Sequence, residues 1–191
     1  MDTGPTEDRT LAEDLLASAR EQFLEHGYEK ASLRQICAGA GVSTGALYNT
    51  FKNKEALFDA LVRPTVAELD RILTLDAPNN EALLYDELFE LLLEHRDGAR
   101  LLVTRADGSR YEGFRRKIRT LLKTVMIRSA ETAGQAGPDP EVADILSAMY
   151  FTGLSELISR DTDPARMQAT AAALRACMES GLRTLSEPPS I

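Results

Sequence analysis

The chain has 191 residues, 43 % of them hydrophobic, so it can bury the core of one or two small domains and is not a disordered polypeptide. Its formal net charge of −8 argues against a protein that coats nucleic acid non-specifically, although it leaves room for a local basic face. Trp is absent, and Leu, Ala, Glu and Arg are frequent, as is typical of helices. The composition therefore predicts an all-α fold.

No targeting or membrane segment is indicated by the sequence. The first residues are polar and acidic, unlike a signal peptide, and no apolar run approaches the ~20 residues that cross a bilayer. Cys37 and Cys177 form no C-x-x-C pair and have no His at ligand spacing, so we expect two reduced thiols packed in helices. The sequence predicts a cytoplasmic protein without a metal, a cofactor or a membrane partner.

Capping signals delimit the N-terminal helices. Thr10 and Glu13 have capping-box spacing and predict a first helix, which is expected to end at Gly27. Ser32 and Gln35 repeat the capping-box spacing and predict a short second helix.

Further caps are expected for the third and fourth helices. Ser43 or Thr44 caps a short third helix, and Asn53 caps the fourth. Pro64 lies within the fourth helix and is expected to bend or interrupt it.

The C-terminal helices have clear starts at two places. Asp139-Pro140 and Asp163-Pro164 each combine an N-cap residue with a first-turn proline. The sequence predicts about nine helices in all, those after the first lying near residues 33–39, 44–50, 54–73, 81–94, 98–105, 111–133, 140–160 and 164–185.

Residues 32–58 carry the most informative pattern. No Asp or Glu occurs between Ala31 and Lys54, although the whole chain is acidic. The glycine cluster at 39–45 lacks the preceding strand and the spacing of a dinucleotide-binding turn, so we interpret it as the turn of a helix-turn-helix. Gly41 permits this turn because it adopts positive φ without steric cost. The third helix is then expected to present small or hydrogen-bonding groups suited to a major groove, namely Thr44, Gly45, Ala46, Tyr48 and Asn49.

Three stretches of this region form a longer pattern. They read A-x-x-x-F-L-E-H-G-Y at 19–28, S-L-R-Q-I-C-A-G-A-G-V-S at 32–43 and G-A-L-Y-N-T-F-K-N-K-E-A-L-F at 45–58. Together they resemble the DNA-binding domain of the tetracycline-repressor (TetR) family, without a gap over residues 10–58. The resemblance implies a helix-turn-helix that binds double-stranded operator DNA.

The resemblance also implies roles for individual residues. Thr44, Tyr48 and Lys54 would contact phosphates, and Lys54 lies at a helix N-terminus, where amide dipoles also favour an anion. Asn49 and the small residues of the third helix would lie near base edges, so shape readout is expected to contribute to specificity. The DNA-binding residues predicted in this way are Lys30, Ser32, Arg34, Ser43, Thr44, Gly45, Ala46, Tyr48, Asn49 and Lys54.

A second functional unit is implied for the rest of the chain. By resemblance, residues 1–55 form the DNA-binding domain, a connecting helix spans about 54–73, and residues 65–188 form a ligand-binding and dimerisation domain. An unidentified small-molecule effector would bind among the middle helices. The predicted pocket residues are Leu88, Leu92, Leu101, Phe114, Ile118, Leu122, Met149 and Phe151.

Charge is unevenly distributed over the middle of the chain. Residues 64–95 hold eight acidic residues and one basic residue, whereas residues 100–128 hold nine basic and two acidic residues. The basic helix at 111–128 either binds an anionic ligand or pairs with the acidic helix before it. Charge runs on helices favour the second interpretation.

The last two helices predict a homodimer. Small residues on them allow close approach, and in the family the corresponding helices of two subunits form a four-helix bundle. A dimer is also needed because one helix-turn-helix reads few bases, whereas two copies about 35 Å apart read a palindrome. The predicted interface residues are Ile145, Met149, Thr152, Gly153, Leu174, Cys177, Met178, Gly181 and Leu182.

The sequence therefore predicts a ligand-responsive repressor that binds a palindromic operator as a dimer and is released by a small molecule. Two alternatives stay open: a DNA-binding regulator without a ligand, and a helical protein-interaction module. An enzyme is not expected, because His26 and His95 have no accompanying nucleophile or carboxylate at catalytic spacing.

Overall fold

The computed structural model describes residues 10–74, 81–132, 137–160 and 163–186. Every regular element within these ranges is an α-helix, which confirms the all-α prediction. The helices are α1 (Leu11–Lys30), α2 (Leu33–Gly39), α3 (Thr44–Thr50), α4 (Lys54–Thr74), α5 (Glu81–Glu94), α6 (Arg96–Thr104), α7 (Phe114–Thr132), α8 (Pro140–Ser159) and α9 (Pro164–Ser186).

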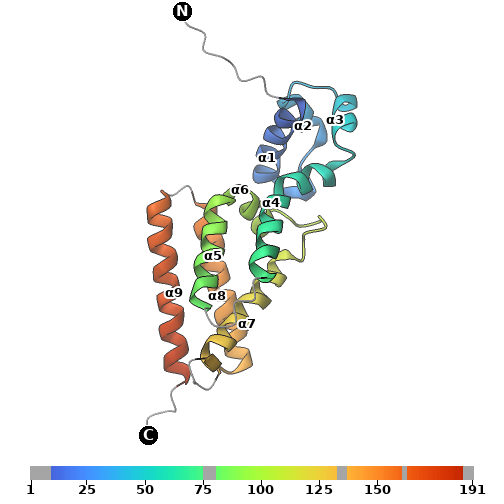
Figure 1. The fold of residues 1–191 in the computed structure, drawn as a ribbon. Coiled ribbons are helices and arrows are strands. Elements are labelled where there is room, and N and C mark those ends of the chain that lie inside the picture. Colours follow the sequence, from blue (N-terminus) through green and yellow to red (C-terminus); the bar gives the residue numbers. More distant parts are fainter. Residues whose placement is uncertain (1–9, 75–80, 133–136, 161–162, 187–191) are drawn as a thin grey trace, which may run out of the picture.

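The molecule has two parts joined by one long helix. Figure 1 shows α1, α2 and α3 gathered at one end and α5, α7, α8 and α9 packed at the other, with α4 running from the first part into the second. The short helix α6 lies where the two parts meet. The domain ends predicted at residues 1 and 188 lie outside the described residues.

The start of α1 confirms the first predicted capping box. The Thr10 amide donates to Glu13 Oε2 at 2.7 Å, and the Glu13 amide donates to Thr10 Oγ1 at 3.3 Å. Gly27 has φ 77° and breaks the helical geometry as predicted, but the helix resumes and ends at Lys30.

The caps of the other helices are confirmed with one exception. Ser43, Asn53, Asp139 and Asp163 each accept a hydrogen bond from an amide of the first turn that follows them. The capping box predicted at Ser32 is wrong, because its side chain makes no capping bond and α2 begins through backbone hydrogen bonds alone.

The helix α4 is continuous from Lys54 to Thr74, so Pro64 does not interrupt it. Proline removes one backbone donor, but the turns on either side keep their hydrogen bonds. The connection between the two parts is therefore one continuous helix that changes direction along its length, so α4 is bent but not broken (Figure 1).

The segment between α6 and α7 differs from the expected helix, which was to begin at 111. Gly108 has φ 80°, and the buried Ser109 hydroxyl donates to the Ala106 carbonyl at 2.7 Å and accepts from the Tyr111 amide at 3.0 Å. These local hydrogen bonds stabilise turns and compete with a helix. As a result α7 begins only at Phe114.

The core of the N-terminal part is not closed by α1–α3 alone. Helices α4 and α6 both insert apolar side chains into it, so residues 1–55 do not contain their whole core. The fully buried members are Leu15, Ala19, Phe23, Ile36 and Leu47 from α1–α3, Leu57, Phe58 and Val62 from α4, and Leu101 and Leu102 from α6.

Two glycines allow helices to approach closely. A Cβ at Gly39 of α2 would overlap Ser18 Oγ of α1, a buried hydroxyl that donates to the Ile36 carbonyl at 2.9 Å. A Cβ at Gly98 of α6 would overlap Thr65 Oγ1 of α4. The second contact fixes the distance between α6 and the connecting helix.

Candidate nucleic-acid interface and interior cavity

The helix-turn-helix forms as the sequence predicts. Gly41 has φ 68°, and the Val42 amide donates to the Cys37 carbonyl at 2.9 Å across the turn. Leu47 is fully buried and anchors α3 against α1 and α2. This anchor determines which side of α3 faces solvent.

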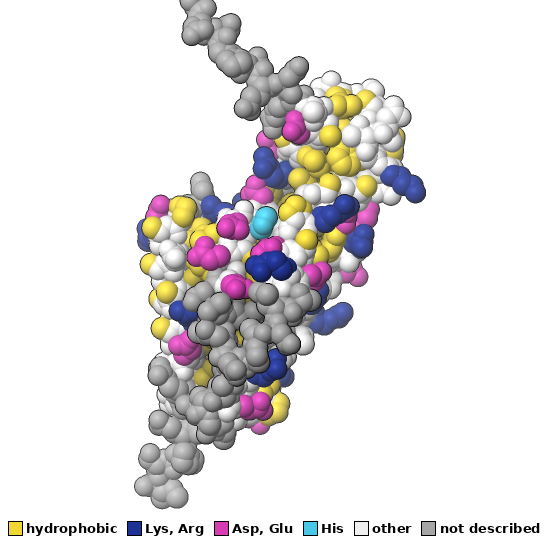
Figure 2. Space-filling view, viewed as in Figure 1, with side chains coloured by type: hydrophobic (Ala, Val, Ile, Leu, Met, Phe, Trp, Pro, Cys, Tyr) yellow, Lys and Arg dark blue, Asp and Glu magenta, His cyan; other side chains and the backbone are white. Residues whose placement is uncertain are grey.

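The residues predicted to face DNA from α3 lie on its solvent side. Thr44, Gly45 and Asn49 are exposed, Ala46 is half-buried, and the Tyr48 side chain is 57 % exposed. Figure 2 shows that hydrophobic and uncharged side chains predominate at this end of the molecule, whereas charged side chains are dense over the rest of the same view. Small groups, one aromatic and few charges thus form the outer face of α3.

The other predicted contacts flank this face. Lys30 and Arg34 are exposed, whereas Ser32 is half-buried. The Ser43 oxygen accepts the Ala46 amide at 3.2 Å, and its hydroxyl hydrogen is not used in that bond. A Ser43 hydroxyl in this position can cap α3 and donate outward at the same time.

Lys54 is held by the protein itself. Its Nζ donates to the Glu29 carbonyl at 3.0 Å and lies 4.9 Å from the centroid of the Tyr28 ring. Burial lowers the pKa of Lys54, and the Glu29 carboxylate opposes that shift. The ammonium has three donors, and the Glu29 bond uses one of them. Lys54 therefore ties the start of α4 to the end of α1, a role that the sequence did not indicate.

A hydrogen-bond network joins the 105–113 segment to α1 and α4. The Tyr28 amide donates to the Arg105 carbonyl at 2.8 Å, and the Tyr28 hydroxyl donates to Glu55 Oε2 at 2.6 Å. The other Glu55 oxygen accepts the Arg110 amide at 3.2 Å. Burial and the Glu55 carboxylate raise the pKa of Tyr28 to about 12.

Asp59 of α4 is the second centre of this network. Its buried carboxylate accepts hydrogen bonds from the Tyr111 hydroxyl and the Arg63 guanidinium and lies 3.4 Å from Arg110 Nη1. The Tyr111 and Arg63 bonds hold the pKa of Asp59 below its ordinary value, while burial and the Asp59 carboxylate raise the pKa of Tyr111 to about 12. The sequence reasoning missed this network, because Glu55 and Asp59 carry no local signal for partners about fifty residues away.

An apolar cavity of about 50 Å³ lies between α4, α5, α6, α7 and α8. Six of the eight predicted pocket residues line it: Leu88, Leu92, Phe114, Ile118, Leu122 and Phe151. The further lining residues, which the sequence reasoning missed, are Thr65, Leu69, Leu91, Ala99, Val103, Leu154, Ser155 and Ile158.

Two predicted pocket residues are placed elsewhere. Leu101 is fully buried in the N-terminal core, because the side of α6 that carries it faces α1 and α4. Met149 is 65 % exposed on the outer side of α8, two residues before the lining Phe151. Neither residue lines this cavity, since an apolar residue type does not reveal which side of a helix it occupies.

The basic residues of α7 form exposed ion pairs. Lys117 Nζ lies 3.0 Å from Asp70 of α4, while Arg119 and Lys123 lie 3.4 Å and 3.8 Å from Asp144 of α8. Pairing across helices is thus present, as the second interpretation of this helix expected, and the partners among the described side chains lie on α4 and α8.

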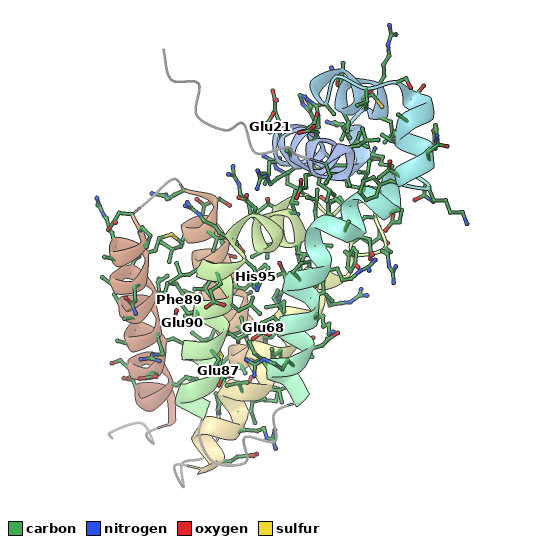
Figure 3. All side chains as sticks on the ribbon, turned by 45° about the horizontal axis from the view of Figure 1, so that its top comes forward. Glu21, Glu68, Glu87, Phe89, Glu90 and His95 are labelled. Atoms are coloured by element: carbon green, nitrogen blue, oxygen red, sulfur yellow. The ribbon has the colours of Figure 1, made fainter. Side chains whose placement is uncertain are left out.

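Further charged residues lie between α4 and α5 and on the side of α5 toward α9 (Figure 3). Figure 3 shows Glu87 and His95 toward Glu68 of α4, and Phe89 and Glu90 on the side of α5 that faces α9. The Glu68 carboxylate pairs with Arg71 at 2.6 Å. Among the described residues no group of three or more His, Cys, Asp or Glu is arranged to hold a metal ion.

The predicted dimer residues divide into exposed and interior positions. Ile145, Met149, Thr152 and Cys177 are exposed, Ile145 by 54 %. The remaining members are the half-buried Gly153, Leu174 and Gly181 and the buried Met178 and Leu182. Gly153 of α8 packs closely against Leu174 of α9, since a Cβ added to Gly153 would lie 3.2 Å from Leu174 Cδ1. Met178 and Leu182 belong to the core of the subunit, and their assignment to the dimer interface stays a prediction.

No helix in the described part of the chain is long and apolar enough to cross a bilayer.

The site as a whole consists of a helix-turn-helix that α4 and α6 join to a helical bundle with an apolar cavity.

Comparisons with known proteins agree with this geometry. Residues 15–61 match the bacterial regulatory proteins of the tetR family. The transcriptional repressor AcnR of Corynebacterium diphtheriae is 30 % identical over 168 aligned positions that cover 83 % of this chain and 87 % of AcnR. The transcriptional regulator UidR of Escherichia coli K12 is 29 % identical, over 97 % of this chain and 100 % of UidR.

A solved structure supports the same assignment. NalD, the secondary repressor of the MexAB-OprM multidrug efflux pump in Pseudomonas aeruginosa, superposes with a TM-score of 0.63 and 25 % identity, over 90 % of this chain and 95 % of NalD. The likeness to AcnR extends through most of both chains rather than the helix-turn-helix alone. The chain therefore belongs to the tetR family and is a helix-turn-helix transcriptional regulator.

Proposed function

We propose that this regulator is a repressor that binds a palindromic operator as a homodimer and leaves it when a small molecule occupies the cavity. The observation that carries the proposal is the double role of α6. Ala99 and Val103 line the cavity, whereas Leu101 and Leu102 of the same nine-residue helix are buried in the N-terminal core. A shift of α6 caused by a ligand must therefore disturb the packing of the helix-turn-helix.

A second connection runs through Phe114. Its ring lines the cavity and packs against the N-terminal core, and it follows directly on the segment that bonds to Glu55 and Asp59 of α4. A ligand acts through these connections only if it prefers one arrangement of the helices, since equal affinity for both shifts nothing.

The DNA contacts follow from the exposed side of α3. Thr44, Tyr48 and the Ser43 hydroxyl would bind phosphates, while Gly45 and Asn49 would lie against base edges. Exposure of these residues and the lack of acidic side chains from 31 to 54 support this arrangement. The small groups allow a close approach and leave much of the specificity to DNA shape.

The dimer would form through the outer side of α8. Ile145 and Met149 are one turn apart and exposed, and Ala148 and Thr152 continue the same stripe. Two copies of this stripe related by a two-fold axis would bury the apolar side chains and place two α3 helices on one duplex.

Selection of bound duplexes from a random pool tests the proposal. A palindromic consensus is expected, and sedimentation at micromolar concentration should give a dimer. The double variant Ile145→Asp, Met149→Asp should sediment as a monomer and lose operator affinity. The control variant Ala67→Asp, at an exposed position of α4, should remain a dimer and keep its operator affinity. Asymmetric sites bound by a monomer would refute the proposal.

A further inference from the structure

We infer that the cavity takes an uncharged, largely apolar molecule of about one or two fused rings, and that this molecule must enlarge the cavity in order to bind. The inference rests on the proposed function, because it treats the cavity as the effector site. It adds the chemical class of the effector and the reason why binding changes the shape of the protein.

The cavity lining offers no partner for a charge. None of the described residues that line it is ionisable, and only Thr65 and Ser155 carry hydroxyls. The Ser155 hydroxyl already donates to the Phe151 carbonyl at 2.7 Å. An ion entering this space would lose its hydration without gaining a counter-charge, which costs far more than its apolar contacts return.

The basic helix does not change this conclusion. Ile118 and Leu122 of α7 line the cavity, whereas Lys117 and Arg119 of the same helix lie outside in ion pairs with α4 and α8. An anion bound by these side chains would sit on the surface of the bundle. The interior and the basic surface are therefore two different environments on one helix.

The volume of the cavity couples binding to movement. About 50 Å³ holds a few water-sized groups, whereas a benzene ring occupies an apolar protein cavity of about 150 Å³. An aromatic guest must displace part of the lining. Val103 and Phe114 are placed to transmit such a displacement, because α6 and the Phe114 ring both also pack against the N-terminal core. Such a guest binds the enlarged state alone and thereby shifts the population toward it.

Naphthalene and two substituted forms provide matched probes. Naphthalene-1-sulfonamide and naphthalene-1-sulfonate have nearly the same size, but only the sulfonate is charged. Because the chain contains no Trp, probe fluorescence can be titrated without a Trp background. Operator affinity is measured in parallel by anisotropy of a labelled duplex. We expect saturable binding of naphthalene, weaker binding of the sulfonamide, and at least about ten-fold weaker binding still of the sulfonate.

Two truncations of buried leucines locate the probe. Leu122 lines the cavity and is 1 % exposed, whereas Leu47 of α3 is 0 % exposed and lies in the N-terminal core. Leu122→Ala should enlarge the cavity and tighten naphthalene binding several-fold, and Leu47→Ala should leave the affinity within about two-fold while losing comparable stability. Equal effects of both variants would overturn the assigned location.

The outcomes separate this inference from the proposed function. Sulfonate binding as tight as that of the sulfonamide, or no naphthalene binding to either the native chain or Leu122→Ala, overturns the inference. Naphthalene binding that is tightened by Leu122→Ala supports the inference whether or not the operator is released. If the operator affinity then stays unchanged at saturating naphthalene, the site and its chemistry stand and the effector role in the proposed function fails.

Discussion

Replacement of Gly98 by Ala probes the contact between α6 and the connecting helix. A Cβ at this position would lie closer to Thr65 Oγ1 than real Cβ atoms approach an oxygen, while the Leu61 carbonyl would be at an ordinary 3.5 Å. Thr65 is buried in α4, and a β-branched side chain has few allowed χ1 rotamers in a helix, so rotation of its hydroxyl offers little relief. The substitution therefore pushes α6 and α4 apart at the edge of the cavity.

Two opposing contributions set the size of the effect. Overpacking of a close helix contact costs about 1–3 kcal/mol, whereas Ala in place of Gly inside a helix returns up to about 1 kcal/mol. We expect a net loss of roughly 1–2 kcal/mol in the free energy of unfolding. For a chain of this length that corresponds to a fall in Tm of roughly 2–8 °C.

A double-mutant cycle with Thr65→Ala isolates the overlap. Without Oγ1 the nearest atom to the new methyl group is the residue 65 Cβ at 3.3 Å, a contact that a shift of a few tenths of an ångström relieves. Gly98→Ala should then be neutral or stabilising in the Thr65→Ala background, with a coupling free energy of about 1–2 kcal/mol from urea unfolding. A rise in stability of the Gly98→Ala single variant, or equal effects of Gly98→Ala in both backgrounds, would refute the steric argument.

Three further predictions concern the caps, the network and the DNA face. Ser43→Ala should cost about 0.5–2 kcal/mol in urea unfolding because it removes the α3 cap, whereas Ser32→Ala, which removes no capping bond, should cost almost nothing; equal losses would contradict the assigned caps. The pKa of Asp59 is lowered in the folded state, so its contribution to stability is complete above its unfolded pKa of about 3.9 and is lost as the pH falls through the folded value. Asp59→Asn should therefore be less stable at neutral pH and lose less stability on acidification than the native chain, and parallel profiles would disprove this role. Lys54→Ala should reduce the slope of log operator affinity against log salt concentration by about one, while Lys117→Ala, far from α3, should leave the slope unchanged. Equal slopes for the two variants would show that Lys54 only ties α4 to the end of α1 and does not contact a phosphate.

The local features of the fold were readable from the sequence. Thr10 with Glu13, and the Asp-Pro pair at Asp139, fix helix starts through bonds within one turn. Gly41 marks the helix-turn-helix because its φ of 68° favours glycine, and Leu47 marks the buried side of α3. Each of these signals spans a few residues, so it does not depend on the remaining chain.

The errors arise where distant segments meet. Leu101 and Val103 are both apolar residues of α6, yet one enters the N-terminal core and the other lines the cavity. No local pattern distinguishes them, because α6 is covered on both sides. The pairing of Asp59 with Tyr111 likewise depends on a turn that folds back onto α4, and neither residue announces its partner.

The arrangement of α6 also limits how the two parts can move. Two contacts hold the end of α6 on the N-terminal part: the packing of Leu102 and the hydrogen bond from the Tyr28 amide to the Arg105 carbonyl. Val103, which lies between Leu102 and Arg105 in the sequence, borders the cavity. A guest that displaces Val103 outward cannot leave Leu102 in place, because the two are adjacent on a rigid helix. The N-terminal part must therefore follow α6 or lose buried apolar contacts worth about 1.5–3 kcal/mol per side chain. Under the proposed function, either result would change the position of α3, and an interior apolar guest would thereby act on a DNA-binding surface that it never touches.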